Sequence, residues 1–153
     1  NILEQLIILA LYMPMMTATG GNTGSQAATV VIRALALGEA SEKNWLQILL
    51  KEARISFLLS FCVGGLVFIK IAFLSSTSLI PPGMTFQKIG LIISLAIAMQ
   101  VMTSAIVGAG LPLLVRKLGG DPAVAASPAI TTTVDITGLL IYFGIASYSL
   151  NIL

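Results

Sequence analysis

Long apolar segments, separated by short polar stretches, constrain the fold of this chain more than any other feature. Only 9% of its 153 residues are charged and 57% are hydrophobic, whereas a soluble domain carries about 25% charged residues. An apolar helix of about 20 residues is long enough to span a bilayer. The sequence therefore predicts a single all-α integral membrane domain, residues 1–153, with four transmembrane helices at residues 2–37, 54–74, 87–115 and 122–151.

The stretches between the predicted spans indicate an additional helix and an orientation. Ser41 is a suitable helix cap and Trp45 suits the membrane interface. We therefore expect a short interfacial helix from Ser41 to Lys51, ahead of the second span. Six of the eight lysines and arginines lie in or beside the first and third connections, and only Lys70 and Lys88 lie on the opposite side. This excess of positive charge predicts that the first and third connections face the cytoplasm.

The first predicted span contains a polar, flexible stretch, Thr17 to Gln26, which reads TATGGNTGSQ and carries no charge. The helix is either continuous through this stretch or broken near Gly20 and Gly21. In a bilayer, backbone that lacks helical partners must be buried in protein or line a wet cavity. The stretch therefore indicates a site where helices approach closely and a polar ligand is handled. The simpler interpretation is close helix packing alone.

Asp135 is a second anomaly, because it places a carboxylate inside the apolar fourth span. An intramembrane ionisable residue marks a functional site by default unless it forms a salt bridge, and no lysine or arginine lies at its depth. Counted from the cytoplasmic ends of their helices at ~1.5 Å per residue, Asn22, Gln100 and Asp135 each lie ~21–24 Å deep. The simplest role of Gln100 is a structural hydrogen bond. The simplest role of Thr131 and Thr132 is to satisfy backbone carbonyls.

The available ligands indicate which ion such a site would hold. Hydroxyl, amide, carbonyl and carboxylate oxygens suit a hard cation, magnesium or calcium, better than zinc or copper. The chain has no histidine, and its single cysteine, Cys62, lies in an apolar run where packing is the expected role. Magnesium sheds water reluctantly, so one carboxylate per chain is expected to hold the hydrated ion through its waters. The net charge of +2 is too small to predict a nucleic-acid partner.

Two motifs carry a family resemblance. They read PMMTATGGNTGSQAATV from Pro14 and LGGDPAVAASPAITTTVDITGLLIYF from Leu118. They are similar to the membrane domain of the MgtE family of magnesium channels, and the resemblance covers essentially the whole chain. It implies that the metal-binding residues are the pore aspartate Asp135, Asn22, Thr131 one turn below the aspartate, and Asp121 near the cytoplasmic mouth, which is most simply a helix cap. It also implies a pore lined by Ala18, Gly20, Gly21, Asn22, Gln26, Thr131, Thr132 and Asp135.

The resemblance further implies a homodimer, surrounded by membrane lipid in a prokaryotic cell membrane, with the pore on its two-fold axis. Such a protein is not an enzyme and passes hydrated Mg2+, its bound and transported ion, into the cytoplasm down the electrochemical gradient. A surface of small residues is expected to carry the dimer contacts; it comprises Ala18, Gly21, Gly24, Gly138 and Ala146.

Two further expectations concern the extent of the chain and the alternative functions that it could have. Family members have five membrane helices after a cytoplasmic magnesium-sensing region with CBS domains. The chain begins with Asn1 and matches neither the first helix nor that region, so we expect it to be part of a longer protein. The alternatives are a coupled divalent-cation carrier, which an internal duplication would favour, and a structural membrane subunit whose small residues only pack helices.

Overall fold

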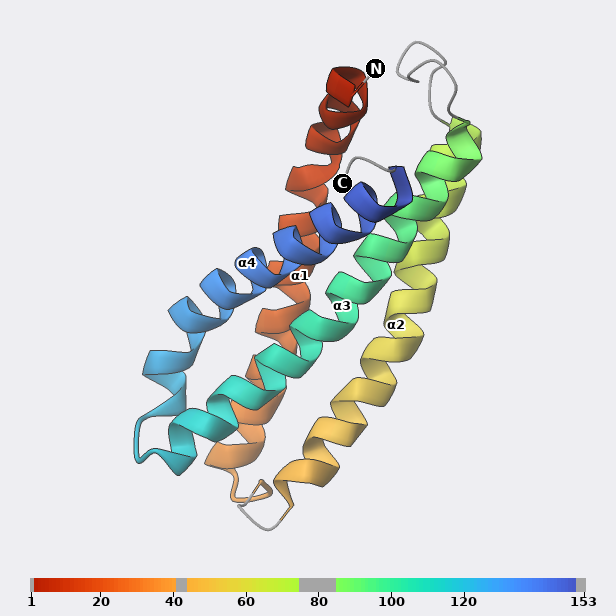
Figure 1. Ribbon diagram of the computed structural model, residues 1–153. Coiled ribbons are helices and arrows are strands. Elements are labelled where there is room, and N and C mark those ends of the chain that lie inside the picture. The colour runs from red at the N-terminus through yellow and green to blue at the C-terminus, as the bar shows by residue number, and fades with distance from the viewer. Residues whose placement is uncertain (1, 41–43, 75–84, 151–153) are drawn as a thin grey trace.

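The computed structural model describes residues 2–40, 44–74 and 85–150, which form long helices (Figure 1). Helix α1 spans Ile2–Ala36, α2 spans Trp45–Leu74, α3 spans Phe86–Lys117 and α4 spans Pro122–Leu150. The α1–α2 and α3–α4 connections lie at the same end of the bundle, and α4 runs obliquely across α1. No strand occurs in the described residues, so the all-α prediction is confirmed.

Within the described ranges, three helices are long and apolar enough to cross a membrane. They comprise Trp45–Phe73, Phe86–Lys117 and Pro128–Ser149, and they correspond to the second, third and fourth predicted spans. Helix α1 has 35 residues and is not among these three helices of the described ranges. A fourth crossing, by α1, stays a prediction.

A separate interfacial helix is not present in residues 44–54. Trp45 to Lys51 form the first turns of α2 instead, while Ser41 lies outside the described residues. The segment WLQILLKEAR contains neither glycine nor proline and consists mostly of good helix formers. Nothing in it interrupts the helical backbone, so α2 begins at Trp45 and not at the predicted Arg54.

Helix α1 is continuous through its polar stretch, which decides between the two predicted alternatives. Its threonine hydroxyls bond to carbonyls of the preceding turn. Thr19 Oγ1 donates to the Met15 carbonyl at 2.7 Å, and Thr23 Oγ1 donates to the Thr19 carbonyl at 2.8 Å. Thr17 Oγ1 lies 3.2 Å from the Pro14 carbonyl. These hydroxyls are thus satisfied without a break in the helix.

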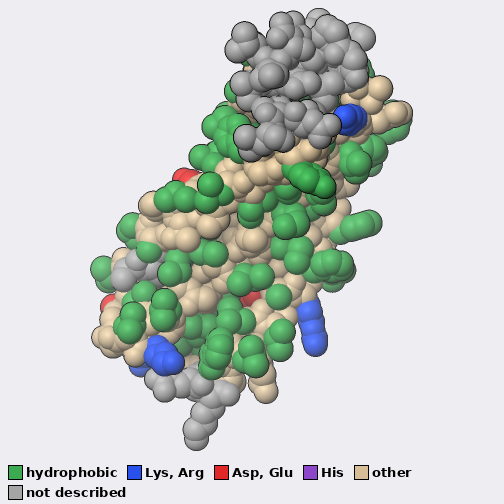
Figure 2. Space-filling view, in the orientation of Figure 1, with side chains coloured by type: hydrophobic (Ala, Val, Ile, Leu, Met, Phe, Trp, Pro, Cys, Tyr) green, Lys and Arg blue, Asp and Glu red, His purple; other side chains and the backbone are tan. Residues whose placement is uncertain are grey.

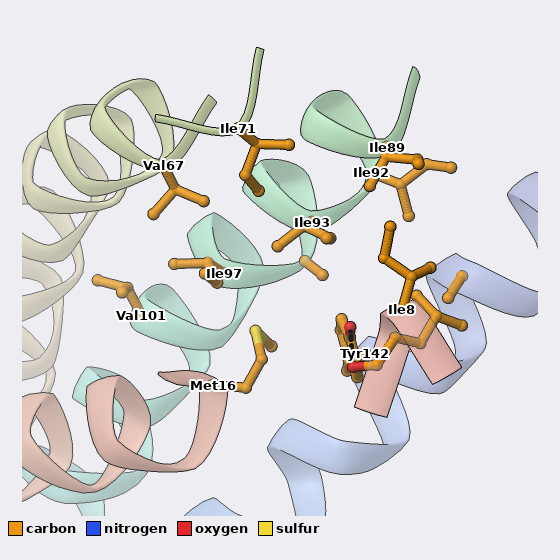
Figure 3. Packing of buried hydrophobic residues seen from close by; sticks show 13 residues of the cluster. Ile8, Met16, Val67, Ile71, Ile89, Ile92, Ile93, Ile97, Val101 and Tyr142 are labelled. Atoms are coloured by element: carbon orange, nitrogen blue, oxygen red, sulfur yellow. Dashed lines mark hydrogen bonds between the residues drawn. The ribbon is translucent and has the colours of Figure 1, made fainter. Parts of the chain in front are cut away.

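Helix α3 is the centre of the bundle. It packs against each of the other helices, and α1 also packs against α4. In its most apolar stretch 61% of α3 is buried, against 28% in α2 and in α4. In the main core, Met16 of α1, Val67 of α2 and Tyr142 of α4 surround Ile93 and Ile97 of α3 (Figure 3). The structure therefore holds α1 and α4 together on one side of α3, with α2 on another part of its surface.

The outer surface of α2 is apolar. Phe61 and Phe73 are 79% and 76% exposed, and Leu66 is 68% exposed. Hydrophobic side chains also cover much of the visible face of the molecule, with few charged side chains between its two ends (Figure 2). Soluble monomers rarely expose apolar surface of this extent. This surface suits contact with lipid.

Candidate ion-binding site

One face of α1 is polar and lies outside the core of the protomer. Its exposed residues in this region are Ala18, Asn22, Ser25, Gln26 and Thr29. Their spacing of three and four residues places them along one side of the helix. Uncharged polar groups on a membrane helix are costly against lipid. This face therefore suits contact with water or with another protein chain.

Asp135 lies on α4 beside the buried face of that helix. Val134 is buried in a cluster with Ala28 of α1, whereas Asp135 is half-buried and Thr131 is exposed. Residues four apart share a helix face, so Thr131 and Asp135 lie one turn from each other on the same side. Helix α4 contains no lysine or arginine. The Asp135 carboxylate therefore has no basic partner on its own helix.

The side chain of Gln100 of α3 packs against both α1 and α4. Its side chain is 0% exposed, and its Nε2 donates a hydrogen bond to the Val134 carbonyl of α4 at 3.0 Å. A Cβ atom at Gly20 of α1 would overlap this amide, and so would a Cβ at Gly138 of α4. The structural hydrogen bond that the sequence predicts for Gln100 is confirmed.

This arrangement places the polar face of α1 and Asp135 at one level of the bundle. Asn22 follows Gly20 by two residues and Asp135 follows Val134 by one. Because Gly20 and Val134 both lie at the Gln100 amide, Asn22 and Asp135 lie within about one turn of that level. The common depth predicted from the sequence has a physical cause in this three-helix contact.

Comparison with known proteins places these elements in a family. The profile of the MgtE family, described as a divalent cation transporter, matches residues 13–145. The chain belongs to the MgtE family. It is 36% identical over 146 residues to the magnesium transporter MgtE of Thermus thermophilus, and 35% identical over 145 residues to that of Bacillus subtilis. Each match covers 95% of this chain and 30% of the relative, so the chain spans about a third of the length of these relatives.

The MgtE match includes both polar elements of the candidate site. Residues 13–145 contain the stretch Thr17–Gln26 in α1 and Asp135 in α4. The predicted location in the cell membrane is confirmed, because the relatives of this MgtE chain are membrane transporters and three helices in the described part of the chain are long and apolar enough to cross a bilayer.

Two residues expected at the site, Asp121 and Gly20, do not lie on the same surface as Asn22 and Asp135. The exposed Asp121 accepts a hydrogen bond on Oδ1 from the Ala123 backbone N–H at 2.9 Å, so it caps α4; an ion-binding role for it stays a prediction. Gly20 is buried against Gln100. A step of two residues turns a helix by about 200°, so Gly20 does not share the exposed face of Asn22, and its place in the pore lining stays a prediction.

The small-residue surface predicted for the dimer also needs correction. Gly24, Gly138 and Ala146 are buried within the protomer, where Gly24 packs toward Val134 and Gly138 toward Gln100. Ala18 is exposed and Gly21 is half-buried. Small residues mark close helix contacts in membranes, and their sequence alone does not tell contacts within a chain from contacts between chains.

A single protomer offers few metal ligands of its own. The described residues contain no group of three or more histidine, cysteine, aspartate or glutamate side chains that would hold a metal ion. At the level of Gln100, α4 contributes one carboxylate, Asp135, and α1 contributes the Asn22 amide. The oxygen chemistry of these groups suits a hard cation, and one carboxylate suits an ion that keeps most of its water.

Proposed function

We propose that this chain forms the pore of a magnesium channel, in which Asp135 holds the passing ion. The observation that carries the proposal is a half-buried carboxylate in an apolar helix without a single lysine or arginine. An unpaired carboxylate in a membrane is costly, so its presence points to a function rather than to stability. The relatives in Thermus thermophilus and Bacillus subtilis are named magnesium transporters, which supports Mg2+ as the ion.

The pore is formed by two copies of the chain. Two exposed polar surfaces are unsuited to lipid: the face of α1 with Asn22 and Gln26, and Thr131 and Thr132 of α4. A second copy of the chain would cover both surfaces while leaving room for water. Two facing copies bring two Asp135 carboxylates together. Their combined charge then matches that of one divalent cation.

The ion passes Asp135 with most of its water shell. Magnesium demands near-ideal octahedral geometry at ~2.0–2.1 Å and dehydrates reluctantly. Two carboxylates satisfy at most a part of that shell directly. Water molecules therefore bridge the ion to Asp135, to the Asn22 amide oxygen and to the hydroxyl of Thr131. Charge at this level selects divalent cations, whereas exact distances to the side chains matter less.

The direction of transport follows from the membrane potential. Arg33 lies in the last turn of α1, and Arg116 and Lys117 lie in the last turn of α3, at the end that carries both short connections (Figure 1). Positive charge of this kind favours the cytoplasmic side. The free energy of a positive elementary charge falls by about 2.3 kcal/mol per 100 mV when it enters a cell with a negative interior. For a divalent cation the fall is twice as large. Passive entry therefore needs no coupled ion.

Flux measurements on the 153-residue chain in liposomes test the proposal. We expect Mg2+ entry above that of empty liposomes, which increases when the interior is made negative, and discrete current steps in a planar bilayer. Absence of Mg2+ entry above the empty control would contradict the function. Entry that requires an opposing ion gradient, without current steps, would identify a coupled carrier and contradict the channel.

A further inference from the structure

Gln100 combines complete burial with an incomplete set of hydrogen bonds. Its Nε2 is bonded to the Val134 carbonyl, but its Oε1 has no hydrogen-bond partner in the described part of the chain. A buried acceptor without a partner lowers stability. Methionine or leucine would fill the same space without that cost. Stability alone therefore gives a poor account of a glutamine at this position.

The space for the Gln100 amide is made by two helices. The Gly20 and Gly138 backbones approach the amide so closely that a Cβ on either residue would overlap it. In an α-helix the carbonyl of residue 134 also accepts the backbone N–H of residue 138. The Gln100 amide thus contacts α4 at the turn that contains Val134, Asp135 and Gly138. Both neighbouring helices are shaped around one hydrogen bond.

This hydrogen bond fixes the part of α4 that carries Asp135. A helix turns by about 100° per residue. A small rotation of α4 about its axis, or a small shift along it, would therefore change the direction in which the Asp135 carboxylate points relative to α1 and α3. The Tyr142 hydroxyl also ties α4 to α1, through the Leu9 carbonyl at 2.6 Å, but it lies about two turns beyond Asp135. Of these two side-chain ties, only Gln100 acts on the residue next to Asp135.

We propose that Gln100 is a positioning residue, which holds α4 at the rotation and height that direct the Asp135 carboxylate into the ion path. It acts on the ion only through the Val134 carbonyl and does not touch it. This inference rests on the proposed function, because it assigns Gln100 a role in ion binding by Asp135. It predicts that loss of the hydrogen bond weakens ion binding while the fold persists.

The test compares Gln100→Met with Ser104→Ala in full chains reconstituted in liposomes. Methionine keeps the length of the side chain and removes both the donor and the unpaired acceptor. Ser104, one turn along α3, is the matched control, because its Oγ is also buried without a partner but forms no bond to α4. The measurements are the thermal stability without Mg2+ and the Mg2+ concentration that gives half-maximal uptake.

For Gln100→Met we expect unchanged or higher thermal stability and a half-saturating Mg2+ concentration raised by about threefold to tenfold, the effect of one interhelical hydrogen bond. Ser104→Ala should keep the wild-type concentration. Wild-type half-saturation in Gln100→Met, or an equal rise in Ser104→Ala, would overturn the inference. So would lower stability with uptake reduced only in proportion to the folded protein.

A second variant and a reference keep the outcomes distinct. Gln100→Asn retains an amide but shortens the side chain by one carbon, so the amide no longer reaches the Val134 carbonyl. If Gln100→Met fails to fold, Gln100→Asn should show the same rise in the half-saturating Mg2+ concentration. A wild-type concentration for Gln100→Asn would overturn the inference.

Asp135→Asn is measured in the same uptake experiment. If wild type transports Mg2+ and Asp135→Asn does not, a wild-type result for Gln100→Met rejects only the role of Gln100. If wild type does not transport, the proposed function fails, and this inference fails with it.

Discussion

Gly108 of α3 lies directly against Gly24 of α1. A Cβ atom at position 108 would fall 2.8 Å from the carbonyl carbon and 2.9 Å from the Cα of Gly24, closer than real Cβ atoms come. Gly24 itself is close to α4, because a Cβ there would lie 3.1 Å from Val134 Cγ2. This glycine pair therefore sets the separation of α1 and α3 about one turn along α1 from Gly20 and about two turns along α3 from Gln100.

Replacement of Gly108 by alanine should destabilise the protein. The obstacle is the backbone of Gly24, which cannot move aside as a flexible side chain can, and overpacking of this kind costs about 1–3 kcal/mol. The measurement is thermal unfolding in detergent. Gly65→Ala is the control, because Gly65 is exposed and a Cβ there meets no atom within 4 Å; alanine should stabilise that helix by up to about 1 kcal/mol. Equal melting temperatures for the two variants would contradict the close approach.

Replacement of Tyr142 by phenylalanine should lower stability moderately and leave Mg2+ uptake largely intact. The change removes the 2.6 Å hydrogen bond to the Leu9 carbonyl and keeps the ring in the core (Figure 3). An interhelical hydrogen bond in a membrane contributes about 0.6 kcal/mol, with a maximum near 1.7 kcal/mol. Tyr148→Phe serves as the control, since Tyr148 is 86% exposed. If both variants have the melting temperature of the wild type, the hydrogen bond between α4 and α1 contributes nothing to the stability of the protein.

Cysteines on the exposed polar faces should crosslink between two copies of the chain. The background is Cys62→Ala, because the native Cys62 is exposed and would react itself. Thr132→Cys places a thiol on the exposed side of α4, which the proposed dimer covers. Leu66→Cys places one on α2, at a side chain that is 68% exposed and faces lipid in the proposal. We expect oxidation in membranes to give dimers for Thr132→Cys and monomers for Leu66→Cys; the reverse pattern would place the interface on α2.

Most of the fold follows from the apolar pattern of the sequence. Long apolar segments predict the positions of α2, α3 and α4, because a membrane helix satisfies all of its backbone hydrogen bonds internally. The ends are less certain from sequence: α2 extends to Trp45 because WLQILLKEAR favours helix as strongly as the span that follows. Helix α1 is continuous through its polar stretch, where the threonine hydroxyls bond to carbonyls of the same helix.

The candidate site is less accessible to sequence reasoning than the fold. Asp135 is recognisable because a carboxylate in an apolar segment is costly wherever it faces. The roles of Gly20 and Gly138 are not recognisable, because a glycine packed against Gln100 inside the chain and a glycine at a dimer contact have the same sequence signature. Gln100 itself is predictable as a hydrogen-bonding residue, but its partner, the Val134 carbonyl, depends on how α3 and α4 pack.

The account depends most on the charge of Asp135. Asp135→Asn keeps the shape of the side chain and an acceptor oxygen but removes the anion. Asp135→Glu keeps the anion on a longer arm, and an ion held through water should tolerate that change in part, whereas a directly bound Mg2+ tolerates little departure from ~2.0–2.1 Å. Both variants should fold, because an unpaired carboxylate in a membrane lowers stability rather than adding to it.

The most direct measurement is Mg2+ uptake by liposomes that contain equal amounts of folded wild type, Asp135→Asn and Asp135→Glu. We expect uptake by Asp135→Asn to fall to the level of empty liposomes and uptake by Asp135→Glu to lie between that level and the wild type. An Asp135→Glu variant as inactive as Asp135→Asn would contradict binding through water only. Wild-type uptake by Asp135→Asn would contradict the assignment of Asp135 as the ion-binding residue of the pore.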